Sequence, residues 1–294
     1  MTSDITKLIG NTPLYKLISC CDKTCSIFAK LEGQNIGGSI KDRVAMALIK
    51  DLEKKNMIDE NTTIFEPSSG NTGIGLAMIG AAKGYKVRIM LPENATPERI
   101  ALLKFFGADI EFCNKEDWKG KTTIEKCKKQ AAQNKNYVMP NQYENPACVA
   151  VHHDTTAKEI LEQCPDLTHF VATVGTGGTI MGVAKRLKKH NPNIQVIGAE
   201  IGADSSIPGP RSIQEWVPPI IDFDFIDKRV MIEDEEAVHK LHRNLAKKEG
   251  LFCGISSAAA LHVAQKIAQE EATKKKKIVC IFPDRGEKYL SSIT

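Results

Sequence analysis

A lysine stands at the start of an expected helix over residues 41–55, directly after the small-residue turn Gly37-Gly-Ser-Ile. A cation is disfavoured there because the N-terminus carries the positive end of the helix dipole. The same field helps to lower the pKa of an amine, and an amine must be neutral to act as a nucleophile or base. An exposed surface lysine is the alternative, so Lys41 becomes a catalytic candidate only in the company of other motifs.

The loop Gly175-Thr-Gly-Gly-Thr179 joins an expected strand to an expected helix and suits a phosphate. Its glycines let the backbone approach a ligand, and free N–H groups at the helix start attract an anion. It lacks the Lys-Ser/Thr ending of a nucleotide P-loop and the GxGxxG dinucleotide spacing. A monophosphate therefore fits better than ATP or NAD. A tight glycine turn without a ligand is an equal alternative for this loop alone.

Two further small-residue turns open helices. Pro67-Ser-Ser-Gly-Asn-Thr-Gly73 could hold a carboxylate with hydroxyl groups and free N–H groups, although the same residues also make a good helix cap. Gly254-Ile-Ser-Ser-Ala258 opens the last long helix. Loops of this kind lie at the carboxyl ends of strands in open α/β sheets, so together they predict one crevice between two lobes.

Short apolar runs alternate with helical patterns, which predicts an α/β fold around mostly parallel sheet. The long irregular stretch 201–225 is expected to be functional. Gly84, Gly107 and Gly250 stand where helices should end. The expected strands are Thr63–Glu66, Lys86–Leu91, Asp109–Phe112, Phe170–Val174, Val196–Glu200 and Ile278–Phe282. The expected helices are Lys41–Lys55, Thr72–Lys83, Pro97–Phe106, Thr155–Gln163, Gly178–His190, Glu235–Glu249 and Ser257–Glu271.

The composition of the 294 residues is that of an ordinary globular protein, with 42% hydrophobic and 26% charged residues. A net charge of +4 is too small to suggest nucleic acid, and neither a signal peptide nor a membrane span is expected. Nine cysteines without a CxxC pair indicate free thiols in a reducing compartment. No histidine pair has the carboxylate or thiol company of a metal site. We therefore expect a cytoplasmic protein that acts on small molecules and needs no metal.

Four motifs resemble, in order, those of the cysteine synthase (O-acetylserine sulfhydrylase) and cystathionine β-synthase family of pyridoxal-phosphate (PLP) enzymes. They are KLEGQNIGGSIKDR, EPSSGNTGIGLA, VGTGGT and CGISSAAA, and the similarity runs from Ile9 to Ser292. The resemblance implies the two-lobed, tryptophan-synthase-β-like PLP fold (fold type II) and a homodimer. It implies a smaller mobile lobe over residues 35–145, with residues 1–34 and 146–294 forming the larger, phosphate-binding domain.

The resemblance also implies a role for each site residue. Lys41 matches the lysine that carries PLP as a Schiff base, Asn71 the asparagine that hydrogen-bonds the pyridine 3′-oxygen, and Ser256 the serine that faces the pyridine nitrogen. The 5′-phosphate loop is implied to be Gly175, Thr176, Gly177, Gly178 and Thr179. The substrate-carboxylate site is implied to be Ser68, Ser69, Gly70, Thr72 and Gln142.

Within the family, the segments Ser205–Arg211, Gly250–Ser256 and Pro283–Ser291 look most like the B-type cysteine synthase. The expected reaction is β-replacement that makes L-cysteine from O-acetyl-L-serine, or a related serine ester, and sulfide. Arg211 is a candidate for binding a larger anionic donor such as thiosulfate, but Ser212 departs from the second arginine expected there. Cystathionine β-synthase, an enzyme using O-phosphoserine, a cysteine-degrading or deaminating enzyme, and an inactive binding scaffold remain open alternatives.

Overall fold

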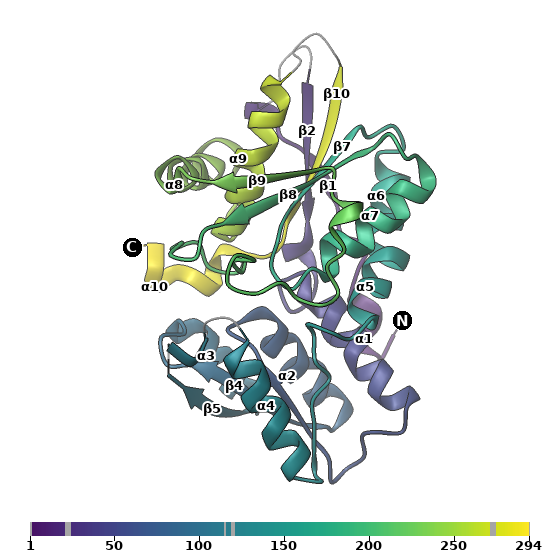
Figure 1. Ribbon diagram of the computed structural model, residues 1–294, viewed down its shortest axis with the longest axis vertical. Coiled ribbons are helices and arrows are strands. Elements are labelled where there is room, and N and C mark those ends of the chain that lie inside the picture. Colours follow the sequence, from purple (N-terminus) through teal and green to yellow (C-terminus); the bar gives the residue numbers. More distant parts are fainter. Residues whose placement is uncertain (1, 21–24, 115, 119–120, 271–274, 294) are drawn as a thin grey trace.

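Two β-sheets organise the chain into two lobes (Figure 1). The computed structural model describes residues 2–20, 25–114, 116–118, 121–270 and 275–293. One sheet has six strands in the order β1-β2-β10-β7-β8-β9, and the other has four in the order β5-β4-β3-β6. All neighbouring strands are parallel except β1, which pairs antiparallel with β2. The expected α/β fold with mostly parallel sheets is confirmed.

The six-stranded sheet is buried on both faces. Its strands are β1 Leu14–Lys16, β2 Cys25–Leu31, β7 His169–Thr173, β8 Gln195–Ile201, β9 Lys228–Ile232 and β10 Lys276–Phe282. Along β10, Ile278 and Cys280 face one hydrophobic core while Val279 and Ile281 face the other. This alternation, with apolar residues on both sides, is what a parallel sheet covered by helices requires.

Helices cover the two faces of this sheet (Figure 1). Helices α8 Glu235–Asn244 and α9 Ile255–Gln269 pack on one face. Helices α6 Ala157–Gln163 and α7 Gly178–His190 pack on the other. A π-helical turn, His152–Thr156, joins α6 to the preceding helix α5 Ala147–Val151. Gly250 adopts φ +67 where a second π-helical turn, Leu245–Glu249, ends after α8. Short π-helical segments often mark functional sites.

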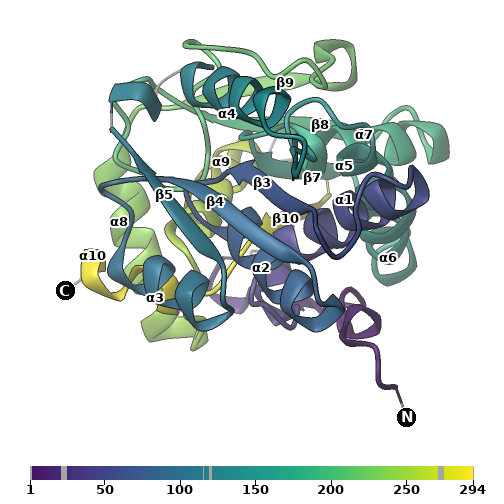
Figure 2. The same cartoon turned by 90° about the horizontal axis from the view of Figure 1, so that it is seen from below.

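The smaller sheet contains β3 Thr63–Pro67, β4 Lys86–Pro92, β5 Asp109–Cys113 and β6 Tyr137–Val138. Figure 2 shows α2 and α3 on one side of this sheet and α4 on the other. One core joins α1 Lys41–Lys54, α2 Asn71–Lys83 and α3 Pro97–Phe105, and a smaller one lies under α4 Thr122–Gln133. Gly84 and Gly107 adopt φ +78 just after α2 and α3. The sheet lies within the range 35–145, and the domain boundaries themselves stay a prediction.

The sequence did not predict β1, β2, β6, β9, α4 and the short helix α10 Leu290–Ile293. The expected helix Thr155–Gln163 is the last part of a longer helical segment that begins at Ala147. The expected helix Ser257–Glu271 begins earlier, at Ile255, and Glu271 lies outside the described residues. The irregular stretch after β8 is confirmed apart from one short turn, Phe223–Phe225. No helix in the described chain has the length and apolarity needed to span a bilayer.

Candidate functional site

A cavity of about 610 Å³ lies where the loops of the two lobes meet. Both glycine-containing loops follow the carboxyl ends of parallel strands, β3 and β7, and both lead into helices. The cavity brings together residues of the expected cofactor and substrate sites: Lys41, Ser68, Ser69, Gly70, Asn71, Thr72, Gln142, Gly175, Thr176 and Arg211. Gly177, Gly178 and Thr179 follow directly along the chain, and Ser256 follows Ile255, which lines the cavity.

Lys41 is the first residue of α1, and its half-buried side chain lines the cavity. Burial lowers the pKa of its amine, while the charges of Cys148 and Asp284 act in the opposite direction. The shift has the direction expected from the sequence, and its main cause is burial. The lowered pKa favours the neutral amine that a nucleophile or base requires.

The loop Ser68–Thr72 is held in place by its own side chains and by Gln142. The Ser68 hydroxyl accepts a hydrogen bond from the Gly73 N–H at 2.9 Å. Thr72 Oγ1 donates to Gln142 Oε1 at 2.7 Å, and the backbone N–H of Gln142 donates to Glu66 at 3.0 Å. Burial raises the pKa of Glu66 to about 7, although hydrogen bonds from the backbone N–H groups of Gln142 and Asn141 oppose the shift.

The loop Gly175–Thr179 has a backbone that favours glycine. Gly177 adopts φ +90, and a Cβ there would lie 2.4 Å from Ile221 Cγ1. Beneath the loop, Thr179 Oγ1 and His152 Nε2 are 3.2 Å apart. Burial lowers the pKa of His152 well below its ordinary value, so a neutral imidazole contacts the loop. The result is a fixed cradle of backbone N–H groups at the start of α7.

Asn71 is fixed by two charged residues from the C-terminal segment. Its Nδ2 donates to Asp284 Oδ2 at 2.7 Å, and Lys288 Nζ donates to its Oδ1 at 2.9 Å. The same Lys288 amine donates to the Gly37 carbonyl at 3.0 Å, in the turn that precedes Lys41. One amide N–H of Asn71 remains for a ligand, because Asp284 accepts only one of the two. Lys288 thus joins the two helix starts that carry Lys41 and Asn71.

Arg211 and Ser256 come from the larger lobe. Arg211 Nη2 donates to the Tyr143 hydroxyl at 3.3 Å, and its guanidinium lies 5.9 Å from the Trp118 ring centre. These aromatic partners come from the smaller lobe, so Arg211 links the lobes at the cavity. Ser256 is buried, and its hydroxyl oxygen lies 3.8 Å from the position of a Cβ built on Gly209, a residue that lines the cavity.

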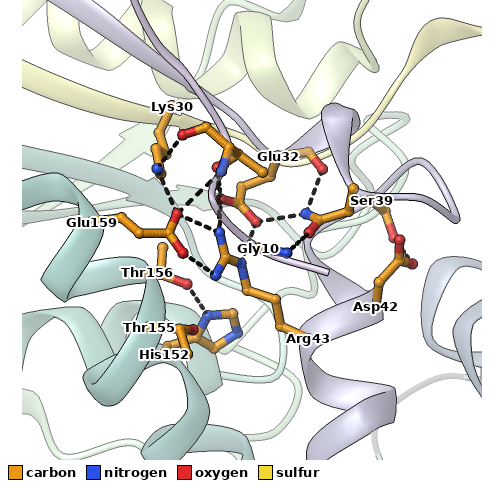
Figure 3. Close-up of polar contacts among 12 residues, drawn as sticks. Gly10, Lys30, Glu32, Ser39, Asp42, Arg43, His152, Thr155, Thr156 and Glu159 are labelled. Carbon is orange, nitrogen blue, oxygen red and sulfur yellow. Dashed lines mark hydrogen bonds and ion pairs between the residues drawn. The ribbon is translucent and has the colours of Figure 1, made fainter. Parts of the chain in front are cut away.

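A buried cluster of four charges holds α1 against the larger lobe (Figure 3). The Arg43 guanidinium donates to Glu32 at 2.8 Å and to Glu159 at 2.7 Å, and Lys30 Nζ donates to Glu159 at 2.7 Å. Burial would raise the pKa of Glu159, but the hydrogen bonds and charges of Arg43 and Lys30 outweigh it and lower the pKa to about 2. Because Arg43 lies two residues after Lys41, the cluster fixes the start of α1.

Several cavity residues were not predicted, among them Arg99, Tyr143 and Tyr289. The sequence could have indicated Arg99, because it is a cation in the first turn of a helix, as Lys41 is. No sequence pattern indicates the contact of Lys288 with Asn71, since the two residues are 217 positions apart. No group of three His, Cys, Asp or Glu residues suited to a metal ion occurs among the described residues.

The fold and the glycine loops define a class of protein that binds a phosphate-bearing cofactor beside a lysine. The sequence profile of a family described as pyridoxal-phosphate dependent enzymes matches residues 5–284, and the chain belongs to this family. Its cofactor is therefore pyridoxal phosphate, and its fold is fold type II.

Curated and solved relatives match the chain over nearly its whole length. A cysteine synthase of Staphylococcus aureus is 41% identical over 301 residues, which cover 98% of this chain and 96% of the relative. The crystal structure of a hydrogen sulfide-producing enzyme of Fusobacterium nucleatum is similar with a TM-score of 0.92 and 36% identity, covering 99% and 100% of the two chains. That of an O-acetylserine dependent cystathionine β-synthase of Helicobacter pylori has a TM-score of 0.91 and 34% identity, covering 99% and 98%.

Proposed function

We propose that the protein is a cysteine synthase, a transferase that makes L-cysteine from O-acetyl-L-serine and sulfide by β-replacement. The observation that carries the proposal is the cavity in which the Lys41 amine, the Ser68–Thr72 loop and the Gly175–Thr179 loop meet. Full-length similarity to a protein named cysteine synthase supports it. The proposed setting is the cytoplasm, where sulfide and free thiols persist.

The residues of the cavity fit the cofactor. A volume of about 610 Å³ accommodates a small organic molecule, since ligand sites span roughly 300–1,000 Å³. The backbone N–H groups of Gly175–Thr179 would hold the phosphate at the start of α7, Asn71 would donate its remaining N–H to the ring oxygen, and Ser256 would face the ring nitrogen. Lys41 Nζ would hold the cofactor covalently. When bound, pyridoxal phosphate supplies an electron sink for the Cα–H bond of an amino acid.

The chain's own residues perform the remaining tasks in the proposed mechanism. The Ser68–Thr72 loop and Gln142 bind the substrate carboxylate and orient its Cα proton toward the lysine. The Lys41 amine, freed when the substrate's amino group takes its place and neutral because burial lowers its pKa, removes that proton and later returns it to Cα. Acetate leaves from Cβ, and sulfide adds at the same carbon. The surrounding lobes exclude water, which would otherwise hydrolyse the substrate skeleton to pyruvate and ammonia after acetate has left and before sulfide adds.

A product panel tests the proposal. The purified holoenzyme is given O-acetylserine, O-phosphoserine or serine, each with sulfide, thiosulfate or homocysteine, and the products are quantified. We expect L-cysteine from O-acetylserine and sulfide to form fastest. Cystathionine as the dominant product, or pyruvate without any replacement product, would contradict the proposal, and no turnover of any pair would identify a scaffold.

We also propose that the protein forms a homodimer, as the resemblance implies. Sedimentation equilibrium of the holoenzyme should give twice the 32.3 kDa mass of the chain. A single species at the monomer mass across micromolar concentrations would contradict the dimer without bearing on the reaction.

A further inference from the structure

Arg99 is a buried cation in the cavity wall that no carboxylate among the described residues pairs with. It is the third residue of α3, and its Nε finds no hydrogen-bond acceptor in the described chain. A cation in the first turn opposes the helix dipole, and a buried charge without a counter-charge is costly. An anion entering the cavity would offset both costs.

Arg99 lies against the Ser68–Thr72 loop. Its Nη1 donates to the Ser69 carbonyl at 3.2 Å. A Cβ on Gly70 would lie 3.1 Å from Arg99 Nε, so glycine lets the guanidinium approach the loop this closely. On its far side the guanidinium lies 4.7 Å from the Tyr289 ring centre, which fixes its plane.

A guanidinium bound to a peptide carbonyl polarises that peptide and strengthens its N–H as a donor. The peptide in question joins Ser69 to Gly70, in the middle of the loop expected to bind a carboxylate, and its Gly70 N–H donates to Ser68 Oγ at 3.3 Å. Lys41 does not supply this charge, because burial favours its neutral form. Arg211 contacts Tyr143 and Trp118.

We propose that Arg99 is the positioning residue that makes the Ser68–Thr72 loop select a carboxylate, acting through the Ser69–Gly70 peptide. The inference rests on the proposed function, because it takes this loop to be the site of the amino-acid carboxylate. It goes further in assigning the selectivity to a charge that lies outside the loop and contacts its backbone. A neutral ligand of the same shape should not sense that charge.

The test compares L-alanine with L-alaninamide, which differ only in the carboxylate and carry no leaving group. Binding is followed by the change in visible absorption of the cofactor in the holoenzyme. In Arg99→Gln the dissociation constant for L-alanine should rise about tenfold or more, while that for L-alaninamide should change less than about twofold. Arg99→Lys, which keeps the charge, should bind L-alanine within about threefold of the wild type.

Arg88→Gln is the matched control, because Arg88 also lies over an aromatic ring of this lobe but pairs with Glu111 and does not line the cavity. It should leave the ratio of the two constants unchanged. Equal losses for both ligands in Arg99→Gln, or no loss for either, would overturn the inference. If Arg99→Gln does not retain the cofactor, the test rests on Arg99→Lys. A tenfold loss of affinity for both ligands in Arg99→Lys would overturn the inference. A wild type that responds to no amino acid would instead refute the proposed function.

Discussion

The amine of Lys41 can act only where it is neutral and close to the cofactor, and we expect Lys41→Ala to abolish both covalent attachment and turnover. The variant should lack the visible absorption band of the lysine-bound cofactor and form no cysteine, because no other amine occupies its place. Absorption spectra and product analysis check this. Lys55→Ala, an exposed change at the end of the same helix, should keep the band and the activity. A lysine-bound band that survives in Lys41→Ala would contradict the assignment.

Lys288 holds the amide of Asn71, which is proposed to contact the cofactor, so we expect removal of the lysine to weaken cofactor binding. Burial lowers the pKa of its amine, although Asp284 and Asp42 oppose the shift. Lys288→Met deletes the hydrogen bond that orients the Asn71 amide, and we expect roughly tenfold weaker cofactor affinity, as for the loss of one such bond. Fluorescence titration of the apoenzyme measures it. In an Asn71→Ala background the same change should cost little more, and fully additive losses would show that Lys288 does not act through Asn71.

At the scale of elements, the turn before α7 depends on a glycine. Gly177→Ala combines φ +90 with a Cβ only 2.4 Å from Ile221 Cγ1. Backbone strain and overpacking together should lower the free energy of unfolding by about 2–4 kcal/mol. Gly84→Ala is the matched control, because φ is +78 there but no atom lies within 4 Å of the added Cβ. Chemical denaturation should show the smaller loss in Gly84→Ala, and equal losses would refute the steric contribution.

Elements with a strong local pattern could be predicted from the sequence. Strands β3, β4 and β10 are short apolar runs, and glycines mark the ends of α2 and α3. Strand β2 is less regular, because Lys30 lies fully buried within it beside Glu159, 129 residues away. Helix α4 buries only Thr123, Ile124 and Cys127, and apart from Ala131 and Ala132 its other residues are polar. Its helical period is therefore marked by few apolar positions.

The site likewise contains some features that the sequence predicts and others that it does not. Its loops could be predicted because backbone N–H groups at helix starts bind anions wherever glycine and small polar residues permit. The supporting contacts could not, because they join distant segments: Arg99 with Tyr289, and Asn71 with Asp284 and Lys288. No local pattern indicates that the C-terminal segment folds back onto α2 and α3.

At the scale of the whole molecule, the buried charge cluster joins α1 of the smaller lobe to β2 and α6 of the larger one. The pKa of Glu159 is lowered from 4.5 to about 2, which corresponds to about 3 kcal/mol of stability. Because the folded-state pKa is the lower one, this stability is fully present above pH 4.5 and is lost as the pH falls through about 2.

Glu159→Gln should therefore be less stable than the wild type by about 3–5 kcal/mol at neutral pH, since it leaves Lys30 and Arg43 buried with only Glu32 as a counter-charge. The difference should narrow as the pH is lowered from 4.5 toward 2, because the wild type then loses the same interaction. Urea denaturation at a series of pH values measures both effects. Glu162 lies on the same helix, but it is exposed and its ion pair with Lys158 is long, at 3.8 Å. The stability of Glu162→Gln should therefore differ little from that of the wild type at any pH. A difference for Glu159→Gln that stays constant down to pH 2 would mean that the glutamate contributes through packing and not through its charge.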